Sequence, residues 1–458
     1  MERKIDLHKN KLLYPFQVLL GKIVHYVFWG IMFIVPPKYK QRFLDLETNT
    51  TLNNIIGLTV FNAFGGFLLM LTNIKLANVL GAAIFGVYSY YVAIGEVGVN
   101  FVRYGRDKSM TRDLIQKPEE FNGLIANTFV LNISNLILFT VAITIFSGLL
   151  DVPISFASFA IIIATCLISL DLQPVYESLR LMSWHSLYNI IQRIFLLVLI
   201  WSPLLIVDSI NLDYLGLSLL ISWFFVLFIQ YKEIVGQLDI KIRNNVSASS
   251  IIGLYKSNFL IAMSCMMGVA FGPLIRMILK SSLDDTAVGL YAASFQIFLI
   301  GKFILTQIAR VGNPMMAEAG KDDCKNSDRI VFVRKYVVIM LLGILPFAIP
   351  MLTLSGIITD ICFTEEYCEI RHYIPLFGLC LFAMAIGNVY EQFLISMRKD
   401  RLYFSIYIGC AFLTVLMALL LIPHYKVLGG VISYVFPNVL ARVLYFAFGT
   451  RILHSTEK

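Results

Sequence analysis

The sequence LGAAIFGVYS at residues 80–89 and the sequence DTAVGLYAAS at residues 285–294 share one pattern. Each has a glycine followed two positions later by a tyrosine, and each lies between two long apolar segments. Placing Gly86 on Gly289 offsets the two copies by 203 residues. The pattern predicts a chain built as two similar halves. We expect the two stretches to be turn and packing elements rather than binding sites.

The composition is that of a membrane protein. Of the 458 residues, 58% are hydrophobic and only 14% are charged, whereas about a quarter of a soluble domain is charged. Most apolar runs are about 20 to 25 residues long, enough for a helix to cross a hydrocarbon core of about 30 Å. They lack the strict alternation of an outer-membrane barrel. We predict an all-α polytopic membrane protein, in which two similar halves usually enclose a transport pathway.

Twelve apolar segments can be delimited in the sequence. Their approximate bounds are 54–76, 84–103, 122–148, 155–178, 184–207, 212–231, 257–279, 287–309, 335–357, 372–395, 402–422 and 427–450. A polar linker over residues 232–256 divides them, so we expect six-helix bundles within residues 51–231 and 257–458. Because each half has an even number of spans, the two pseudo-symmetric halves enter the membrane in the same direction.

The distribution of Lys and Arg predicts the orientation. The loops after spans two, six, eight and ten are rich in these residues, whereas the opposite loops are nearly free of them. The loop after span nine is acidic, with Asp360, Glu365, Glu366 and Glu369. By the positive-inside rule, both termini are expected in the cytoplasm. The basic loops explain the net charge of +8, so we expect no nucleic-acid partner.

Residues 12–35 form a further apolar stretch, inside an N-terminal extension over residues 1–50. Basic residues flank this stretch on both sides, so a true span would place one of the two basic clusters on the extracytoplasmic side of the membrane. We favour an amphipathic helix that lies in the membrane interface, and a true span is the alternative.

The sequence shows no set of residues with catalytic or metal-ligand spacing. The six histidines are scattered, the seven cysteines form no zinc pattern, and no Walker loop occurs. We therefore expect no enzyme activity, no cofactor and no metal site, and any driving force would come from an ion or substrate gradient. Cys362 and Cys368 share one predicted extracytoplasmic loop, where they either pair or remain free thiols.

Several charged residues lie inside the predicted spans. A charge at the centre of a bilayer costs about 2.5–3.5 kcal/mol, so each one is a functional candidate. The clearest cases are Glu96, Asp171, Arg193, Lys302 and Arg442. Lys75 and Arg276 lie near the outer ends of spans one and seven, and the repeat partner of Arg276 is Asn73.

Three short motifs, in their order along the chain, resemble those of a known family. The stretch at residues 80–89 resembles the loop after the first span of polysaccharide exporters, and the stretch at residues 285–294 resembles its second copy. The sequence PMMAE from Pro314 to Glu318 resembles the exit from their eighth span. Over residues 50–450 the chain is similar to the Wzx-type O-antigen and polysaccharide flippases of the multidrug/oligosaccharidyl-lipid/polysaccharide (MOP) exporter superfamily.

This resemblance implies two six-helix bundles that face each other across a central cavity. It implies a flippase of the bacterial inner membrane for O-antigen, lipopolysaccharide or surface polysaccharide biosynthesis. Its substrate would be a polyprenyl-pyrophosphate-linked oligosaccharide, moved between leaflets by alternating access. The other implied partners are membrane lipids, H⁺ or Na⁺ as a coupling ion, and further polysaccharide-assembly proteins of the membrane.

A pyrophosphate head group would give the intramembrane cations a role, because arginine binds phosphate through two hydrogen bonds and lysine binds it as a point charge. We expect an anionic head-group path formed by Lys75, Arg193, Arg276 and Lys302. Glu96 either carries a coupling ion or pairs with one of these cations. Arg442 faces either the cavity or a buried partner, and we expect Asn73 to line the cavity.

Two other functions are weighed against the flippase. A drug or cation antiporter of the same superfamily would have the same spans, but cations inside the membrane favour an anionic substrate. A membrane glycan polymerase or ligase usually carries a large extracytoplasmic loop, whereas the longest such loop here has about a dozen residues.

Overall fold

The computed structural model describes residues 50–149, 155–179, 181–204, 210–238, 245–319, 326–397 and 399–455. The long helices in these ranges are α3 (Thr50–Arg103), α5 (Phe121–Leu149), α6 (Phe156–Leu167), α8 (Met182–Leu204), α9 (Leu212–Leu238), α11 (Ala248–Met267), α13 (Asp285–Ala319), α14 (Asn326–Thr353), α16 (Ile374–Ser396) and α17 (Asp400–Ser455). The shorter ones are α4 (Arg106–Gln116), η2 (Pro118–Glu120), η3 (Ile168–Leu170), α7 (Gln173–Ser178), η4 (Gly268–Phe271), α12 (Pro273–Ser282), α15 (Ser355–Cys362) and η5 (Glu365–His372). The predicted interfacial helix at residues 12–35 lies outside the described residues.

The all-α membrane architecture is confirmed, and the count of spans follows from two kinks. Ten helices of the described ranges are long and apolar enough to cross a membrane, and two of these apolar stretches are 40 and 53 residues long. Those two lie in α3 and α17, which are interrupted by Gly81 (φ 72°) and Lys426 (φ 52°). A positive φ lies outside the right-handed helical region, so the helix is interrupted at that residue, and glycine adopts such a φ readily. Divided at the kinks, α3 and α17 supply two spans each, in agreement with the twelve segments.

Spans four and seven are broken helices. In span four, η3 and the extended residue Asp171 (φ −60°, ψ 136°) separate α6 from α7. In span seven, η4 and Gly272 separate α11 from α12, which begins at Pro273. Proline suits the first position of a helix because the missing N–H would have no partner there. Irregular backbone inside a membrane is tolerated where it lines a wet cavity, so both breaks point to one.

Two boundaries differ from the predicted ones. α9 continues to Leu238 and α11 begins at Ala248, so helix occupies part of the predicted linker at residues 232–256. The acidic segment after span nine is folded into α15 and η5. In both places helical turns continue past the apolar segment into polar sequence, which hydropathy alone does not register.

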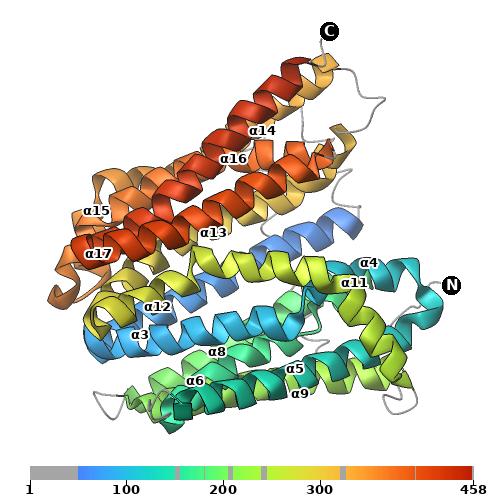
Figure 1. Ribbon diagram of the computed structural model, residues 1–458, viewed down its shortest axis with the longest axis horizontal. Coiled ribbons are helices and arrows are strands. Elements are labelled where there is room, and N and C mark those ends of the chain that lie inside the picture. Colours follow the sequence, from blue (N-terminus) through green and yellow to red (C-terminus); the bar gives the residue numbers. More distant parts are fainter. Residues whose placement is uncertain are drawn as a thin grey trace.

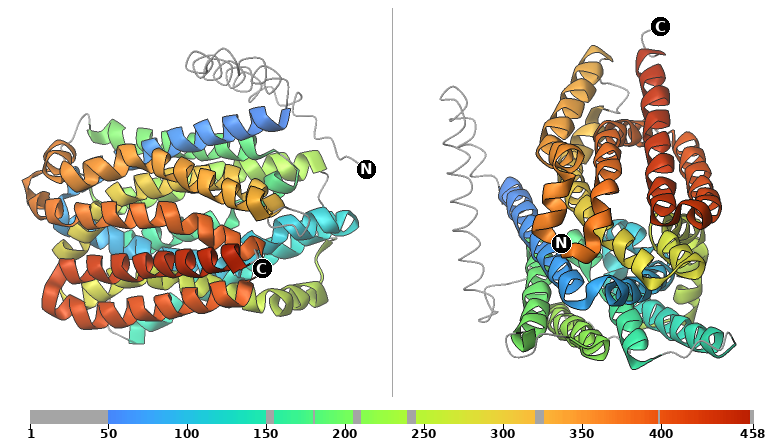
Figure 2. Two further views of the ribbon diagram at one scale, coloured as in Figure 1. Left: turned by 90° about the horizontal axis from the view of Figure 1, so that it is seen from above. Right: turned by 90° about the vertical axis from the view of Figure 1, so that its left-hand side faces the viewer.

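The helices run between two ends of the molecule. We call the end where α15 lies the kink end, and the opposite end, where α4 lies, the α4 end (Figure 1). The kink of α3 at Gly81 belongs to the first of these, because it contacts Glu366 of η5, the helix that follows α15. Toward the α4 end, the ribbons of α14, α16 and α17 slant away from those of α5, α6 and α9 (Figure 1). Seen end-on, these two groups lie on opposite sides, with α3 between them (Figure 2). The two halves of the chain therefore come closest at the kink end.

The two glycine stretches meet at the kink end. A Cβ atom added to Gly86 would lie 1.7 Å from the carbonyl oxygen of Asp285, and one added to Gly289 would lie 2.0 Å from the carbonyl oxygen of Ala82. The contact is reciprocal, since each carbonyl belongs to the residue four positions before the other glycine. α3 and α13 thus pack backbone against backbone at repeat-related positions, and only glycine leaves room for this. The turn itself is made by Gly81.

The segment between α14 and α16 clamps the kink of α3. The Tyr367 hydroxyl donates to the carbonyl oxygen of Ala77 (3.0 Å), and the Asn78 amide donates to that of Cys362 (2.9 Å). A Glu366 carboxylate oxygen accepts from the backbone N–H of Ala82 (2.9 Å). Burial and the neighbouring Glu366 raise the pKa of the Tyr367 hydroxyl, so it remains a protonated donor at physiological pH. These bonds join the second half of the chain to the first.

An aromatic cluster fixes α13 within the second half. The rings of Phe295 and Phe298 lie 5.1 and 5.4 Å from the ring of Tyr434 on α17, and the ring of Phe377 on α16 lies 5.2 Å from that of Phe298. Such contacts add about 0.5–1.5 kcal/mol each to the burial of the rings. With this face of α13 held in the core, another face, with Gln296, Leu299 and Lys302, borders the hollows described below.

Candidate functional site

A polar cavity of about 660 Å³ lies between the two halves. Most of its lining comes from α3, α6, α8 and α9 of the first half, and α12 and α13 of the second half add Arg276 and Gln296. Both broken spans border it, through Asp171 and Pro273. The lining extends from Leu76 and Tyr88, near the kink end, to Arg103, where α3 ends beside α4.

Helix α8 presents a polar stripe to this cavity. His185, Asn189, Gln192 and Arg193 all line it, and they lie at positions i, i+4, i+7 and i+8 of the helix. This spacing places side chains on one face of an α-helix. Of these four residues, only Arg193 was predicted from sequence as a candidate. Their common spacing was the signal that could have identified the stripe.

Arg276 and Glu96 form an ion pair between the halves, from α12 to α3. Arg276 is buried, and its guanidinium also donates to the backbone carbonyl of Ser89 (3.3 Å). The Glu96 side chain is 41% exposed and faces the cavity. Of the two expectations for Glu96, the structure shows the ion pair with a cation. Arg276, one of the four cations predicted to bind the head group, therefore already has an anionic partner within the protein.

Asp171 and His185 form a second pair at the cavity wall. The Nε2 atom of His185 lies 2.6 Å from a carboxylate oxygen of Asp171. The side chains are only 10% and 6% exposed, for His185 and Asp171 respectively. The other carboxylate oxygen, Oδ1, is buried and has no hydrogen-bond partner within the described ranges. Asp171 reaches this position because the chain is extended there, between η3 and α7.

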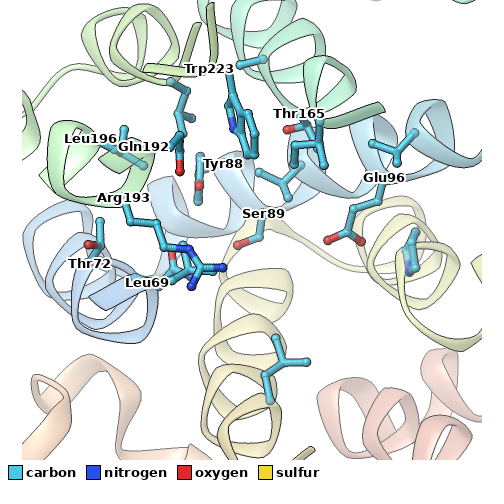
Figure 3. A pocket seen from close by; sticks show the side chains of 18 of the residues that line it. Leu69, Thr72, Tyr88, Ser89, Glu96, Thr165, Gln192, Arg193, Leu196 and Trp223 are labelled. Atoms are coloured by element: carbon cyan, nitrogen blue, oxygen red, sulfur yellow. The ribbon is translucent and has the colours of Figure 1, made fainter. Parts of the chain in front are cut away.

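Arg193 has no acidic partner in the part of the chain that the structure describes. Its guanidinium lies against Gly65 of α3, where an added Cβ would be 2.5 Å from a guanidinium nitrogen. Figure 3 shows Arg193 and Glu96 pointing into the cavity from opposite sides, with Trp223 of α9 along the wall. The absence of a side chain at position 65 thus makes room for a cation with unused donors.

A second hollow of about 470 Å³ adjoins the cavity. It is an apolar groove between α3 and α13, with Phe67, Phe303 and Phe347 in its wall. Leu69, Arg193, Gln296 and Leu299 line both hollows, so the two are neighbours. Lys302 lines the groove, is half-buried, and like Arg193 has no acidic partner among the described residues. Two unpaired cations therefore line the apolar groove, and one of them, Arg193, lies where the groove meets the polar cavity.

The remaining candidates are divided between the cavity and other places. Asn73 is buried and lines the cavity. Lys75 is exposed and lines neither hollow, so the structure does not bring it together with the other three cations. Arg442 pairs with Glu391 and lies 5.6 Å from the centre of the Tyr445 ring, away from both hollows. It faces a half-buried partner rather than the cavity.

The two cysteines of the kink end, Cys362 and Cys368, are free thiols in the structure. Within the described ranges, no three His, Cys, Asp or Glu side chains gather closely enough to hold a metal ion.

Comparison with known proteins places the fold. No family model matches the sequence. A capsular polysaccharide biosynthesis protein of Staphylococcus aureus, CapF, is 24% identical over 278 residues, which cover 60% of this chain and 68% of that protein. A mutant of the Vibrio cholerae MATE transporter VcmN superposes with a TM-score of 0.61 at 15% identity, over 89% of this chain and 98% of that one. A MOP-superfamily transporter of Pyrococcus furiosus, described as having a binding pocket of reverse polarity, gives a TM-score of 0.58 at 13% identity over 89% and 96%. The chain therefore has the fold of the MATE transporters of the MOP superfamily.

Proposed function

We propose that this protein is a transporter that moves a polyprenyl-pyrophosphate-linked oligosaccharide across the bacterial inner membrane for surface polysaccharide biosynthesis. One observation carries the proposal: Arg193 and Lys302, without acidic partners in the described chain, both line an apolar groove, and Arg193 also lines the polar cavity that the groove adjoins. A lipid-linked glycan has the matching three parts, namely an apolar chain, an anionic head and a large polar sugar. The MOP fold and the similarity to CapF support this reading.

The charges of the cavity favour an anionic substrate. Its lining holds the arginines at 103, 193 and 276 against the carboxylates of Glu96 and Asp171. Both carboxylates already have partners, and Lys302 of the adjoining groove adds a further cation. An arginine in a wet cavity can replace part of the hydration that a pyrophosphate loses on leaving water. A drug or cation antiporter, the second candidate, would rely on carboxylates that are free to bind a cation, whereas in the described lining Glu96 is paired with Arg276 and Asp171 with His185.

The proposed path differs from the one expected from sequence. Arg193 and Lys302 form its centre, and Arg276 joins it when the substrate or a change of conformation releases Glu96. Lys75 is left out because its side chain is exposed away from both hollows. Asn73, Asn100, Asn189 and Gln192 border the cavity and supply donors and acceptors for sugar hydroxyl groups.

The test is export of surface glycan in a strain that lacks the native gene. Charged hydrogen bonds contribute about 1.5–3 kcal/mol, so we expect Arg193→Ala or Lys302→Ala each to reduce export at least about tenfold. The double variant should accumulate lipid-linked repeat units on the cytoplasmic side. Lys75→Ala is the matched control, since it removes a cation that lies on a membrane-spanning helix but lines neither hollow. Wild-type export by a stably inserted double variant would sink the proposal.

A further inference from the structure

We propose that His185 and Asp171 form a proton-binding site in the cavity wall, and that its occupancy strengthens the binding of an anion at Arg193. The pair was not predicted from sequence, and its coupling to an anion at Arg193 rests on the proposed function. The proton is taken up by the pair, and it need not be assigned to one of the two residues. The unprotonated pair is a carboxylate beside a neutral imidazole, and the protonated pair is a carboxylate beside an imidazolium.

The geometry of the pair requires one shared proton. A separation of 2.6 Å between Nε2 and the carboxylate oxygen places the two atoms within hydrogen-bond distance. The contact exists only while a proton lies between these atoms, from the imidazolium, from the neutral imidazole tautomer with Nε2–H, or from a protonated carboxyl. Histidine is the side chain whose ordinary pKa, about 6.5, lies nearest to neutrality.

The surroundings leave room for a change in the protonation of the pair. Oδ1 of Asp171 is buried without a partner in the described part of the chain, and the amide of Asn189 lies 3.5 Å from either ring nitrogen of His185. Gln230 of α9 lies beside the carboxylate, but no hydrogen bond of ordinary geometry joins them. Neither partner is locked by a second strong interaction, whereas Glu96 is held by a permanently charged arginine.

The charged and titratable groups that surround the pair come from four elements. They are Arg103 of α3, which donates to the carbonyl oxygen of Ile168, Arg106 and Asp107 of α4, Tyr176 and Glu177 of α7, and Tyr231 and Glu233 of α9. Arg106 is paired with Asp113, Glu177 accepts from Thr111 and Gln173, and Glu233 accepts from Tyr176 and Tyr188. Arg103 is thus the one cation beside the pair without a carboxylate partner of its own among these groups.

The pair is close enough to Arg193 to influence an anion there. His185 of the pair and Arg193 both lie on α8, eight positions apart, which is about 12 Å along a helix axis. At an effective dielectric constant of about 20 to 40, one added positive charge at that distance strengthens anion binding about 3- to 10-fold. By linkage, the bound anion strengthens proton binding by the same factor. Protonation should therefore favour the substrate-bound cavity, and this advantage is lost as pH rises through the pKa of the pair.

The first experiment measures the site without a substrate. Full-length protein with ¹³C,¹⁵N-labelled histidine, in lipid nanodiscs, is titrated from pH 5 to 9 by NMR, and His185→Gln identifies the resonance. We expect His185 to titrate inside this range, and Asp171→Asn to lower its midpoint by at least one unit because the stabilising carboxylate is lost. An imidazole that keeps one charge state from pH 5 to 9 would overturn the proton site.

The second experiment measures the coupling. Geranylgeranyl pyrophosphate binding is compared at pH 6 and pH 8 for wild type, His185→Gln and Glu96→Gln. The probe itself loses a proton in this range, so the informative quantity is the ratio of wild type to variant at each pH. We expect that ratio to change 3- to 10-fold for His185→Gln and to stay constant for Glu96→Gln. A constant ratio for His185→Gln refutes the coupling, and absence of any binding to wild type refutes the proposed function while the NMR titration still decides the proton site.

Discussion

Replacing Gly289 with alanine should push the protein out of the conformation seen here. The added Cβ would lie 2.0 Å from the carbonyl oxygen of Ala82, and ordinary contact begins at 3.4 Å. The helices α3 and α13 would thus have to separate by about 1.4 Å at this point, the difference between these two distances. The obstructing atom belongs to the backbone and cannot rotate away as a side chain would.

The size of the effect follows from the overpacking alone. Overpacking of this kind costs about 1–3 kcal/mol, and the cost applies only while the kink end is closed. The higher helix propensity of alanine relative to glycine is the same in both folded conformations, so it cancels from their equilibrium. Since a penalty of about 1–3 kcal/mol corresponds to about a 5- to 150-fold change in an equilibrium, a conformation with a parted kink end should gain that factor.

Spin labels report this change directly. Ala83 on α3 and Ser282 on α12 are both exposed near the kink end, one in each half, and serve as label sites. We expect double electron–electron resonance to show a larger population at long distances in Gly289→Ala than in its parent. Gly86→Ala should act in the same direction, because its Cβ would lie 1.7 Å from the carbonyl oxygen of Asp285.

Gly409→Ala is the matched control, since this glycine also lies inside a membrane-spanning helix but has nothing within 4 Å of an added Cβ. It should leave the distance distribution unchanged. An unchanged distribution in Gly289→Ala itself, with the protein folded, would refute the argument that this backbone contact holds the kink end closed.

Three further predictions concern the pairs and the clamp. Glu391→Gln should lower the stability measured in thermal unfolding by about 2–3 kcal/mol, less than for a fully buried pair because the side chains of Glu391 and Arg442 are 22% and 15% exposed. A second change, Arg442→Met, should restore most of this stability, and no loss of stability in Glu391→Gln would contradict a structural role for the pair. Glu366→Ala should favour the parted kink end by about 1 kcal/mol, because the hydrogen bond from the Ala82 N–H is lost. Glu365→Ala, which changes the adjacent exposed residue, should leave the spin-label distances unchanged, and identical distances in the two variants would count against the clamp. Burial raises the pKa of the Cys362 thiol, whereas the side chain of Cys368 is exposed. At pH 7 a membrane-impermeant maleimide should therefore label Cys368 at least tenfold faster than Cys362, and equal rates would contradict the described burial.

The sequence predicted the spans and the repeat well because both depend on local patterns. Hydropathy measures the length of each apolar segment directly, and the kinks at Gly81 and Lys426 do not alter it. The glycine stretches were expected to pack, but not against each other. That contact joins residues about 200 positions apart, and nothing in either stretch alone specifies its partner.

The placement of Lys75 shows where the repeat argument lost precision. Asn73 is the exact repeat partner of Arg276, and it lines the cavity. Lys75 is two residues further along, and two residues turn a helix by about 200°, so its side chain faces the other way. A near-equivalent position in a helix is therefore not an equivalent direction. The ion pairs could not be predicted from sequence because their partners are distant in the chain. Glu96 and Arg276, for example, are 180 residues apart.

The distinction between paired and unpaired charges gives the intramembrane residues their separate roles. A charge inside a membrane is costly, and a partner offsets that cost within the protein itself. Arg442 with Glu391, and Arg276 with Glu96, are compensated in this way in the described structure. Arg193 and Lys302 are not, although Gly65 and the apolar groove make room for them. A cation kept without an internal partner at such a place is best explained by an anion that arrives from outside the protein, and that is the property expected of a substrate site.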